Sequence, residues 1–400
     1  MARLLTLPHA STSRDRHLAD FAGMSVLASG SWMSAERLDT TFVSDPPKTL
    51  RLDEGLRFRT GEVIAPFEIV YETFGELNAD RSNAILVCHA LSPSAHAAGK
   101  YKADDPKPGW WDGMIGYGKG IDLDEHFVVC VNFPGSPWGT TAPHSIDPAT
   151  GKPYGSKYPW VCVEDMITAQ ARVLDHLGID KLEAVVGSSL GGMQALMWVV
   201  MYPERVDAMI CIAATASVPV ATIAWHLIGR KMIMSDPAFA GGDYYDSTNP
   251  LRGLEIARMI GHMTYLSNEA LEKKFGRRRP GSSRQLQVDS YLEYQAKRFA
   301  KAYDANAYIR VQAAMDEMDL ADQFGSLQIA FQNFRGKALL IAFDTDWLFP
   351  RIDIARLHGA MRAAGIDATL SEIITPNGHD AFLIDYPLIT PPVKSFLARR

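Results

Sequence analysis

A serine at position 189 stands in the five-residue pattern GSSLG (187–191), which is a G-x-S-x-G motif. In this motif the serine occupies a sharp strand-to-helix turn, and its hydroxyl is exposed as a nucleophile. The pattern is short enough to occur by chance. Here, however, an apolar strand-like run precedes it and an apolar helix-like run follows it, as the motif requires. We therefore predict that Ser189 is a catalytic nucleophile.

A nucleophilic serine needs a base within hydrogen-bond reach and a carboxylate that orients this base. Sheets that carry such a turn supply these groups in the chain order serine, aspartate, histidine, at the carboxyl ends of later strands. Asp344 and Asp346 directly follow one strand-like run, and His379 follows another. His379 is the predicted base, whereas spacing alone does not choose between the two aspartates.

The negative charge that develops on a substrate carbonyl oxygen needs two backbone N–H donors, which together form an oxyanion hole. One donor is expected from Leu190, the residue after the serine, and the other from the loop after the first parallel strand. Within that loop, at 89–92, we assign the second donor to Leu91.

Five strand-like sequence runs must position these residues. They are apolar almost throughout, as in parallel strands that are buried on both faces. A helical pattern at 164–177, ended by Gly178, lies between two of them. Shorter alternating runs between Leu50 and Phe74 predict antiparallel strands before them. Strands that alternate with helices indicate a doubly wound α/β fold. The apolar runs are 84–89, 127–132, 182–186, 208–213 and 338–343.

Far more residues separate the last two of these runs than an ordinary crossover needs. Helical patterns at 253–260 and 288–303 predict that residues 216–331 form a helical lid insertion over the serine. Residues 48–215 and 332–400 would then form the α/β core. Residues 1–47 lack sustained periodicity, and we interpret them as an N-terminal extension rather than a targeting peptide.

Composition limits the partners of this 400-residue chain, of which 47% is apolar. A formal charge of -6 gives no reason to expect a nucleic-acid partner, and no apolar run approaches the roughly 18 residues of a membrane span. Four cysteines without C-x-x-C spacing suit buried thiols in a reducing compartment such as the cytoplasm. No metal-ligand pattern is present, so we expect neither a metal nor a cofactor.

Several longer motifs, taken in order from about Phe42 to the C-terminus, resemble the homoserine O-acetyltransferase family of the α/β-hydrolase superfamily. The resemblance implies an α/β-hydrolase fold with a helical lid. It also implies a ping-pong transfer of an acetyl group from the co-substrate acetyl-CoA to the hydroxyl of L-homoserine, a step of methionine biosynthesis. The motifs are CHALSPSAHAAG (88–99), GWWDGMIGYGKGID (109–122), IDPATGKPYG (146–155), GSSLGGMQAL (187–196), GLEIARMIGHMTYLS (253–267), DTDWLFP (344–350) and GHDAFL (378–383).

The resemblance also implies roles for single residues. It places the triad acid at Asp346 rather than Asp344, with His379 as the base. Arg230 and Asp380 would hold the amino-acid acceptor, because a carboxylate suits a guanidinium fork and an ammonium suits a carboxylate. The family resemblance further implies a homodimer formed through the helical insertion.

Two departures from the family pattern bear on the substrates. The stretch NFPGSPWGTTAP (132–143) replaces a family stretch like N-x-L-G-G-C-x-G-S-T-G-P, which leaves donor and acceptor open. Leu348 stands where succinyl-using homoserine enzymes resemble each other in having an arginine, and this favours acetyl. The alternatives are a serine or homoserine O-succinyltransferase, or an ester hydrolase with the same triad. The cations at 273–274 and 277–279 suit either CoA phosphates or a solvated surface.

Overall fold

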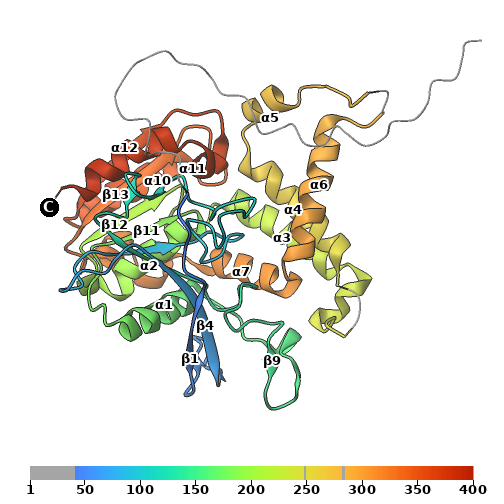
Figure 1. Cartoon of the computed structure of the whole chain (residues 1–400). Helices are drawn as coiled ribbons and strands as arrows, with labels where there is room; N and C mark the ends of the chain where they lie inside the picture. Colours follow the sequence, from blue (N-terminus) through green and yellow to red (C-terminus); the bar gives the residue numbers. More distant parts are fainter. Residues whose placement is uncertain (1–40, 247–248, 282–283, 400) are drawn as a thin grey trace, which may run out of the picture. The chain divides into compact units, whose positions relative to one another are not determined.

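An eight-stranded sheet runs through the computed structural model, which describes residues 41–246, 249–281 and 284–399 (Figure 1). The strand order is β1-β4-β8-β5-β11-β12-β13-β14. β1 and β4 are antiparallel to each other, β4 is antiparallel to β8, and every later pair is parallel. The strands are β1 (Lys48–Leu52), β4 (Phe67–Phe74), β5 (Ala84–Cys88), β8 (Phe127–Val131), β11 (Ala184–Ser188), β12 (Ala208–Ile212), β13 (Lys337–Phe343) and β14 (Asp367–Ile373).

The four central strands β8, β5, β11 and β12 are buried along their whole length. Because side chains alternate across a strand, each one contributes to two cores. In β5, Leu86 and Cys88 join one hydrophobic cluster, whereas Ile85 and Val87 join the other. The near-continuous apolar runs of the sequence therefore arise because these strands are buried on both faces of the sheet. The prediction of a doubly wound α/β fold is confirmed.

Helices and a long loop cover the two faces of the sheet. Helices α1, α2 and α10 pack into the first cluster, and α12 packs into the second together with the segment 90–123. α1 ends at Gly178, whose φ of 67° closes the helix in the left-handed conformation. These helices are α1 (Val163–Leu177), α2 (Leu190–Met201), α10 (Arg351–Ala363), α11 (Ala381–Ile384) and α12 (Tyr386–Leu397).

The described residues between β12 and β13 are mainly helical and contribute no strand to the sheet. Figure 1 shows α3, α4 and α6 as a group beside the sheet. α4 packs between α3 and α6. The helices of this segment, which is called the lid below, are α3 (Val220–Met234), α4 (Leu251–Tyr265), α5 (Asn268–Lys274), α6 (Gln287–Ala302), α7 (Ala305–Glu317), α8 (Leu320–Phe324) and α9 (Leu327–Phe331), of which α9 packs against α10 of the core.

The expected extension, 1–47, lies outside the described residues up to residue 40. From residue 41 the chain already contacts the core. The ring of Phe42 packs edge-on against Phe74 and Tyr117, and the Ser44 amide donates to the carbonyl of Lys100. The ordered core therefore includes residues before β1.

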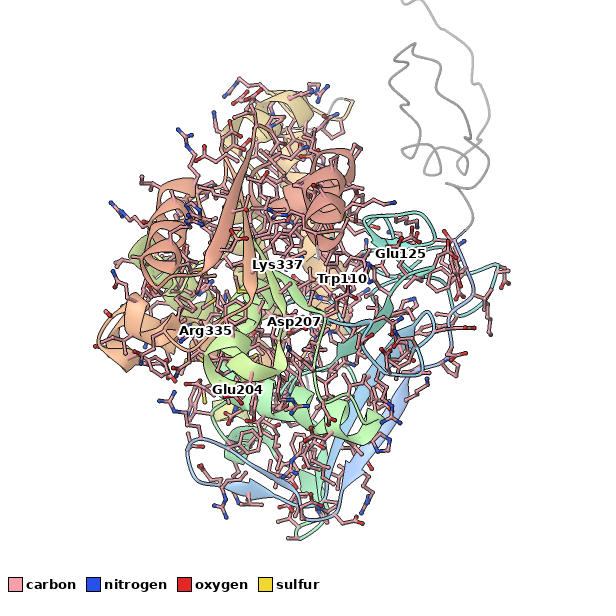
Figure 2. The ribbon with its side chains drawn as sticks, turned by 90° about the vertical axis from the view of Figure 1, so that its left-hand side faces the viewer. Trp110, Glu125, Glu204, Asp207, Arg335 and Lys337 are labelled. Atoms are coloured by element: carbon pink, nitrogen blue, oxygen red, sulfur yellow. The ribbon has the colours of Figure 1, made fainter. Side chains whose placement is uncertain are left out.

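The amino edge of the sheet is polar. Figure 2 labels Asp207, Arg335 and Lys337, which lie where β12 and β13 begin. A hollow of about 580 Å³ opens there, and the ammonium of Lys337, one of its lining residues, donates to the carbonyl of Phe396. Lys337 thus binds the end of α12, which is a structural role. Among the described helices, none is long and apolar enough to cross a membrane.

Candidate active site

Ser189 lies at the corner between β11 and α2, at the carboxyl edge of the sheet. Its φ of 56° and ψ of -127° are strained for a residue with a side chain. The corner needs glycines on both sides. A Cβ atom on Gly187 would stand 2.0 Å from the Gly191 carbonyl oxygen, and one on Gly191 would stand 2.0 Å from that of Cys88. The G-x-S-x-G spacing therefore follows from close backbone packing.

His379 and Asp346 complete a hydrogen-bonded chain with Ser189. The Nε2 atom of His379 lies 2.9 Å from Ser189 Oγ, and its Nδ1 atom lies 2.8 Å from Asp346 Oδ2. All three residues are buried. An ionised carboxylate only accepts, so Nδ1 carries the proton and Nε2 is free to accept the serine proton. The arrangement can therefore generate a serine nucleophile.

The structure distinguishes the two aspartates that spacing left open. Asp346 Oδ1 accepts hydrogen bonds from the amides of Leu348 and Phe349, which fixes the carboxylate toward His379. Asp344 instead accepts from the amide of Thr375, at the start of the loop that carries His379. Asp344 therefore braces this loop, and Asp346 alone of the two contacts the imidazole.

The two residues assigned to the oxyanion hole, Leu190 and Leu91, are both buried. Leu190 begins α2, where the first amides of a helix have no partner within the helix. Leu91 lines the cavity in front of Ser189, and its carbonyl oxygen accepts a 2.8 Å hydrogen bond from the Tyr303 hydroxyl. Neither backbone amide has a partner among the described residues.

The unusual loop at 133–138 lies behind the Leu91 loop. Phe133 stacks on His89 with a centroid distance of 4.5 Å, and the ring of Trp138 packs edge-on against Tyr303. Burial lowers the pKa of His89 to about 4, so this imidazole is neutral. None of the loop residues lines the cavity in front of Ser189. The loop therefore supports the oxyanion side of the site without direct access to a ligand there.

A cavity of about 300 Å³ opens in front of Ser189, between the core and the lid helices α4 and α6. Arg258 is the one arginine or lysine among the described residues that line it. Its guanidinium lies 4.3 Å from the centroid of the Phe299 ring, and its Nη1 donates to Ser92 Oγ. The lining residues are Ala90, Leu91, Ser92, Pro93, Ser189, Arg258, His262, Tyr265, Tyr291, Gln295, His379, Asp380, Phe382 and Leu383.

Asp380, the residue after the base, brings a carboxylate to this cavity. Burial raises its pKa, while His379, Arg258 and Lys274 act in the opposite direction. No described residue donates a hydrogen bond to the carboxylate. Near it, His262 is kept neutral, because burial and then Arg258 and Lys274 lower its pKa to about 3. An unpaired acid and an arginine therefore share one small cavity.

Arg230 does not join this cavity, and its expected role needs correction. Its Nη1 donates to Asp316 Oδ2 at 2.6 Å, and His226 binds the other oxygen of the same carboxylate at 2.6 Å. The Asp316 carboxylate thus holds Arg230 in the packing between α3 and α7. Arg258 is the arginine that the cavity contains. Its sequence signal was the helical spacing of Arg258, His262 and Tyr265, which places all three on one face of α4.

Within the part of the chain that the structure describes, no group of three or more histidine, cysteine or acidic side chains is arranged to hold a metal ion. The four cysteines are free thiols, three of them buried.

Comparisons with known proteins place this site in context. A family model for the alpha/beta hydrolase fold matches residues 83–386. A homoserine O-acetyltransferase from Deferribacter desulfuricans is 44% identical, over 88% of this chain and 95% of that protein. A homoserine O-succinyltransferase from Burkholderia cenocepacia is 48% identical, over 85% of this chain and 92% of that protein.

Solved structures agree with these matches. A homoserine O-acetyltransferase from Bacillus anthracis superposes with a TM-score of 0.84 at 32% identity, covering 89% of this chain and 98% of that one. An esterase, E22, superposes with a TM-score of 0.82 at 30% identity, covering 88% of this chain and 100% of that one. One architecture thus serves both transferases and an esterase.

Proposed function

Because the chain belongs to the homoserine O-acyltransferase family of the α/β-hydrolase fold, we propose that it transfers an acetyl group from acetyl-CoA to the hydroxyl of L-homoserine. The product is an activated ester for methionine biosynthesis. The observation that carries this proposal is the cavity in which the Ser189 triad meets an arginine and an unpaired carboxylate. A hydroxylated amino acid needs both kinds of partner.

In the first half-reaction, Ser189 Oγ attacks the thioester carbonyl while His379 Nε2 takes its proton. Asp346 holds the imidazole in the required tautomer and stabilises the imidazolium. The amides of Leu91 and Leu190 are assigned to the carbonyl oxygen as it becomes an oxyanion. Collapse of the resulting tetrahedral intermediate breaks the C–S bond, and His379 protonates the departing thiolate. CoA then dissociates, and Ser189 carries the acetyl group as an ester.

In the second half-reaction, His379 takes the proton of the homoserine hydroxyl, whose oxygen attacks the acetyl-serine carbonyl. The ester bond to Ser189 breaks, and the serine oxygen recovers a proton from the imidazolium. Water would give hydrolysis at the same point. The lid helices α4 and α6 line the cavity, and their side chains leave less room for bulk water around the acyl-serine.

The acceptor is held by the groups that are unpaired in the cavity. Arg258 is assigned to the α-carboxylate and Asp380 to the ammonium, because neither group forms an ion pair with a described residue. Tyr265 adds a hydroxyl that no described residue binds. This assignment keeps the earlier role of Asp380 and moves that of Arg230 to Arg258.

The charge of the cavity favours acetyl over succinyl as the acyl group. If the acceptor carboxylate occupies Arg258, the second carboxylate of a succinyl group finds no other arginine or lysine among the described lining residues. Leu348, which is apolar and buried, adds none. Succinyl transfer to homoserine or serine is the alternative that the assay below includes.

A homodimer in the cytoplasm completes the proposal. Large apolar side chains on α3 are exposed, which is typical of a surface that another subunit covers. Free cysteines suit a reducing compartment. The exposed residues on α3 are Val220, Trp225, Leu227, Ile228 and Met234.

A free-thiol assay tests the reaction. Acetyl-, propionyl- and succinyl-CoA are each combined with homoserine, serine or no acceptor, and Ser189→Ala serves as the inactive control. We expect the highest turnover with acetyl-CoA and homoserine, and an acetyl adduct on Ser189 in mass spectra. Equal thiol release with and without an acceptor would identify a hydrolase, as in the esterase relative, and would overturn the proposal.

A further inference from the structure

The two lid helices that line the catalytic cavity carry different chemistry. α4 supplies Arg258, which together with Asp380 suits a zwitterionic amino acid. α6 supplies Tyr291 and Gln295, which lie one turn apart and carry no charge. No described residue makes a hydrogen bond with the Tyr291 hydroxyl or the Gln295 amide. The α6 wall therefore offers neutral donors and acceptors that the acceptor amino acid does not require.

A lysine stands directly behind this wall. The ammonium of Lys274, the last residue of α5, lies 4.2 Å from the centroid of the Tyr291 ring. Partial burial lowers the pKa of Lys274, and the Asp380 carboxylate in the cavity acts on it in the opposite direction. Figure 1 draws α5 beside the beginning of α6. The cation is thus next to the catalytic cavity although it does not line it.

Lys274 belongs to a run of five cations, none of which lines the cavity itself. The run is exposed, and none of its members forms an ion pair with a described carboxylate. Arg278 donates instead to the carbonyl oxygens of Phe275 and Lys274. Five like charges within seven residues repel one another, and a polyanionic ligand relieves this repulsion. The cations are Lys273, Lys274, Arg277, Arg278 and Arg279.

We propose that α6 and the cation run form the binding track for the CoA part of the acyl donor. Tyr291 and Gln295 bind the amide groups of the pantetheine arm, and the cations bind the diphosphate and the 3′-phosphate. The order of chemistry along the protein is a nucleophile, a neutral hydrogen-bonding wall and a cationic surface. CoA presents a thioester, two amides and phosphates in the same order. This inference rests on the proposed function. It assigns the acyl donor to α6, whereas the acceptor binds to Arg258 of α4 and to Asp380.

Two donors separate the parts of the track, because acetyl-pantetheine has the amides of acetyl-CoA but lacks its nucleotide phosphates. The triple variant Lys273→Gln/Lys274→Gln/Arg277→Gln should lower kcat/KM for acetyl-CoA by about tenfold, and that for acetyl-pantetheine by less than about twofold. Gln295→Leu should lower both by a similar factor of about threefold to tenfold, since both donors carry the amides. Arg172→Gln, an exposed cation of α1, is the matched control and should change neither.

Salt gives a second readout, because added salt screens exposed charges. For the wild type, the ratio of kcat/KM for acetyl-CoA to kcat/KM for acetyl-pantetheine should fall between 0.05 and 0.5 M NaCl. The fall should be about as large as the loss of this ratio in the triple variant. An equal effect of the triple variant on both donors, or no effect on either, would overturn the track. A wild type that uses acetyl-CoA but transfers nothing to homoserine would instead contradict the proposed function.

Discussion

The hydroxyl of Tyr303, which follows lid helix α6, donates a 2.8 Å hydrogen bond to the carbonyl oxygen of Leu91. Tyr303 is buried, with its ring stacked on Phe299 and in edge contact with Trp138. The lid is therefore bound to the loop that is assigned to the oxyanion hole. Changes in lid packing can act on the chemistry through this bond.

Tyr303→Phe keeps the ring and removes the bond, and it should slow acylation of the enzyme. We expect a loss of about threefold to tenfold in the pre-steady-state burst of thiol release, smaller than the 10²–10³ that follows from losing a direct oxyanion donor. The matched control is Tyr308→Phe, a second buried lid tyrosine, whose hydroxyl accepts from the Gln312 amide. A burst that is equally fast in Tyr303→Phe and the wild type would contradict a positioning role.

Asp346→Asn should cost much more activity than Asp344→Asn. Only Asp346 contacts His379, so its amide would no longer fix the tautomer or stabilise the imidazolium; kcat should fall on the order of 10⁴. Asp344→Asn keeps a side-chain oxygen that can accept from the Thr375 amide and removes only the charge, so it should cost about tenfold or less. Steady-state kinetics on both variants, with thermal melts to verify folding, decides between them. The opposite ranking would make Asp344 the triad acid.

Sequence reasoning reached the triad because each member depends on local features. The glycine spacing at Ser189 and the strand ends before Asp346 and His379 are visible along the chain. Buried strands, likewise, leave continuous apolar runs such as 84–88. Asp344 and Asp346 follow the same strand and are separated by one residue, so their position along the chain does not show which of them is the triad acid. Their partners, Thr375 and His379, come from a distant loop.

The lid was harder to interpret because its function depends on how helices pack. Arg230 and Arg258 both occur in apolar helices of the insertion. What separates them is Asp316, 86 residues beyond Arg230, which neutralises that arginine and leaves Arg258 for the cavity. The Tyr303–Leu91 bond spans 212 residues, and no local pattern encodes it.

Asp380→Asn should stabilise the fold while it damages transfer. Burial raises the pKa of this carboxyl above its ordinary value of 3.8, so the folded state disfavours the ionised form. The resulting cost is fully present above the folded-state pKa and disappears below the unfolded-state pKa. At pH 7 we expect the variant to melt about 1–2 °C higher than the wild type, with the gap closing as the pH falls toward 3.8.

Asp385→Asn is the matched control for this experiment. Asp385 is an acid of the same region, but it accepts hydrogen bonds from Thr375 and Asn377. Its replacement should lower the melting temperature, because donors lose an ionised acceptor. Scanning calorimetry from pH 3.5 to 8 measures both variants. A lower melting temperature for Asp380→Asn at pH 7 would show that the carboxylate has stabilising partners in the free protein.

Arg258→Lys should raise the KM for homoserine by about tenfold or more, because an ammonium keeps the charge but loses the two-pronged geometry for a carboxylate. Acylation by acetyl-CoA, reported by the first turnover of thiol release, should change far less, since the acetyl group needs no cation. Arg230→Lys is the matched control: its guanidinium is engaged by Asp316, and the substitution should leave the KM for homoserine within about twofold. The rate of acylation comes from the pre-steady-state burst of thiol release, and the KM for homoserine comes from steady-state thiol release on the same samples.

A larger KM effect from Arg230→Lys would return the carboxylate site to α3. A burst in Arg258→Lys that falls as much as the steady state would place Arg258 in the acylation step instead.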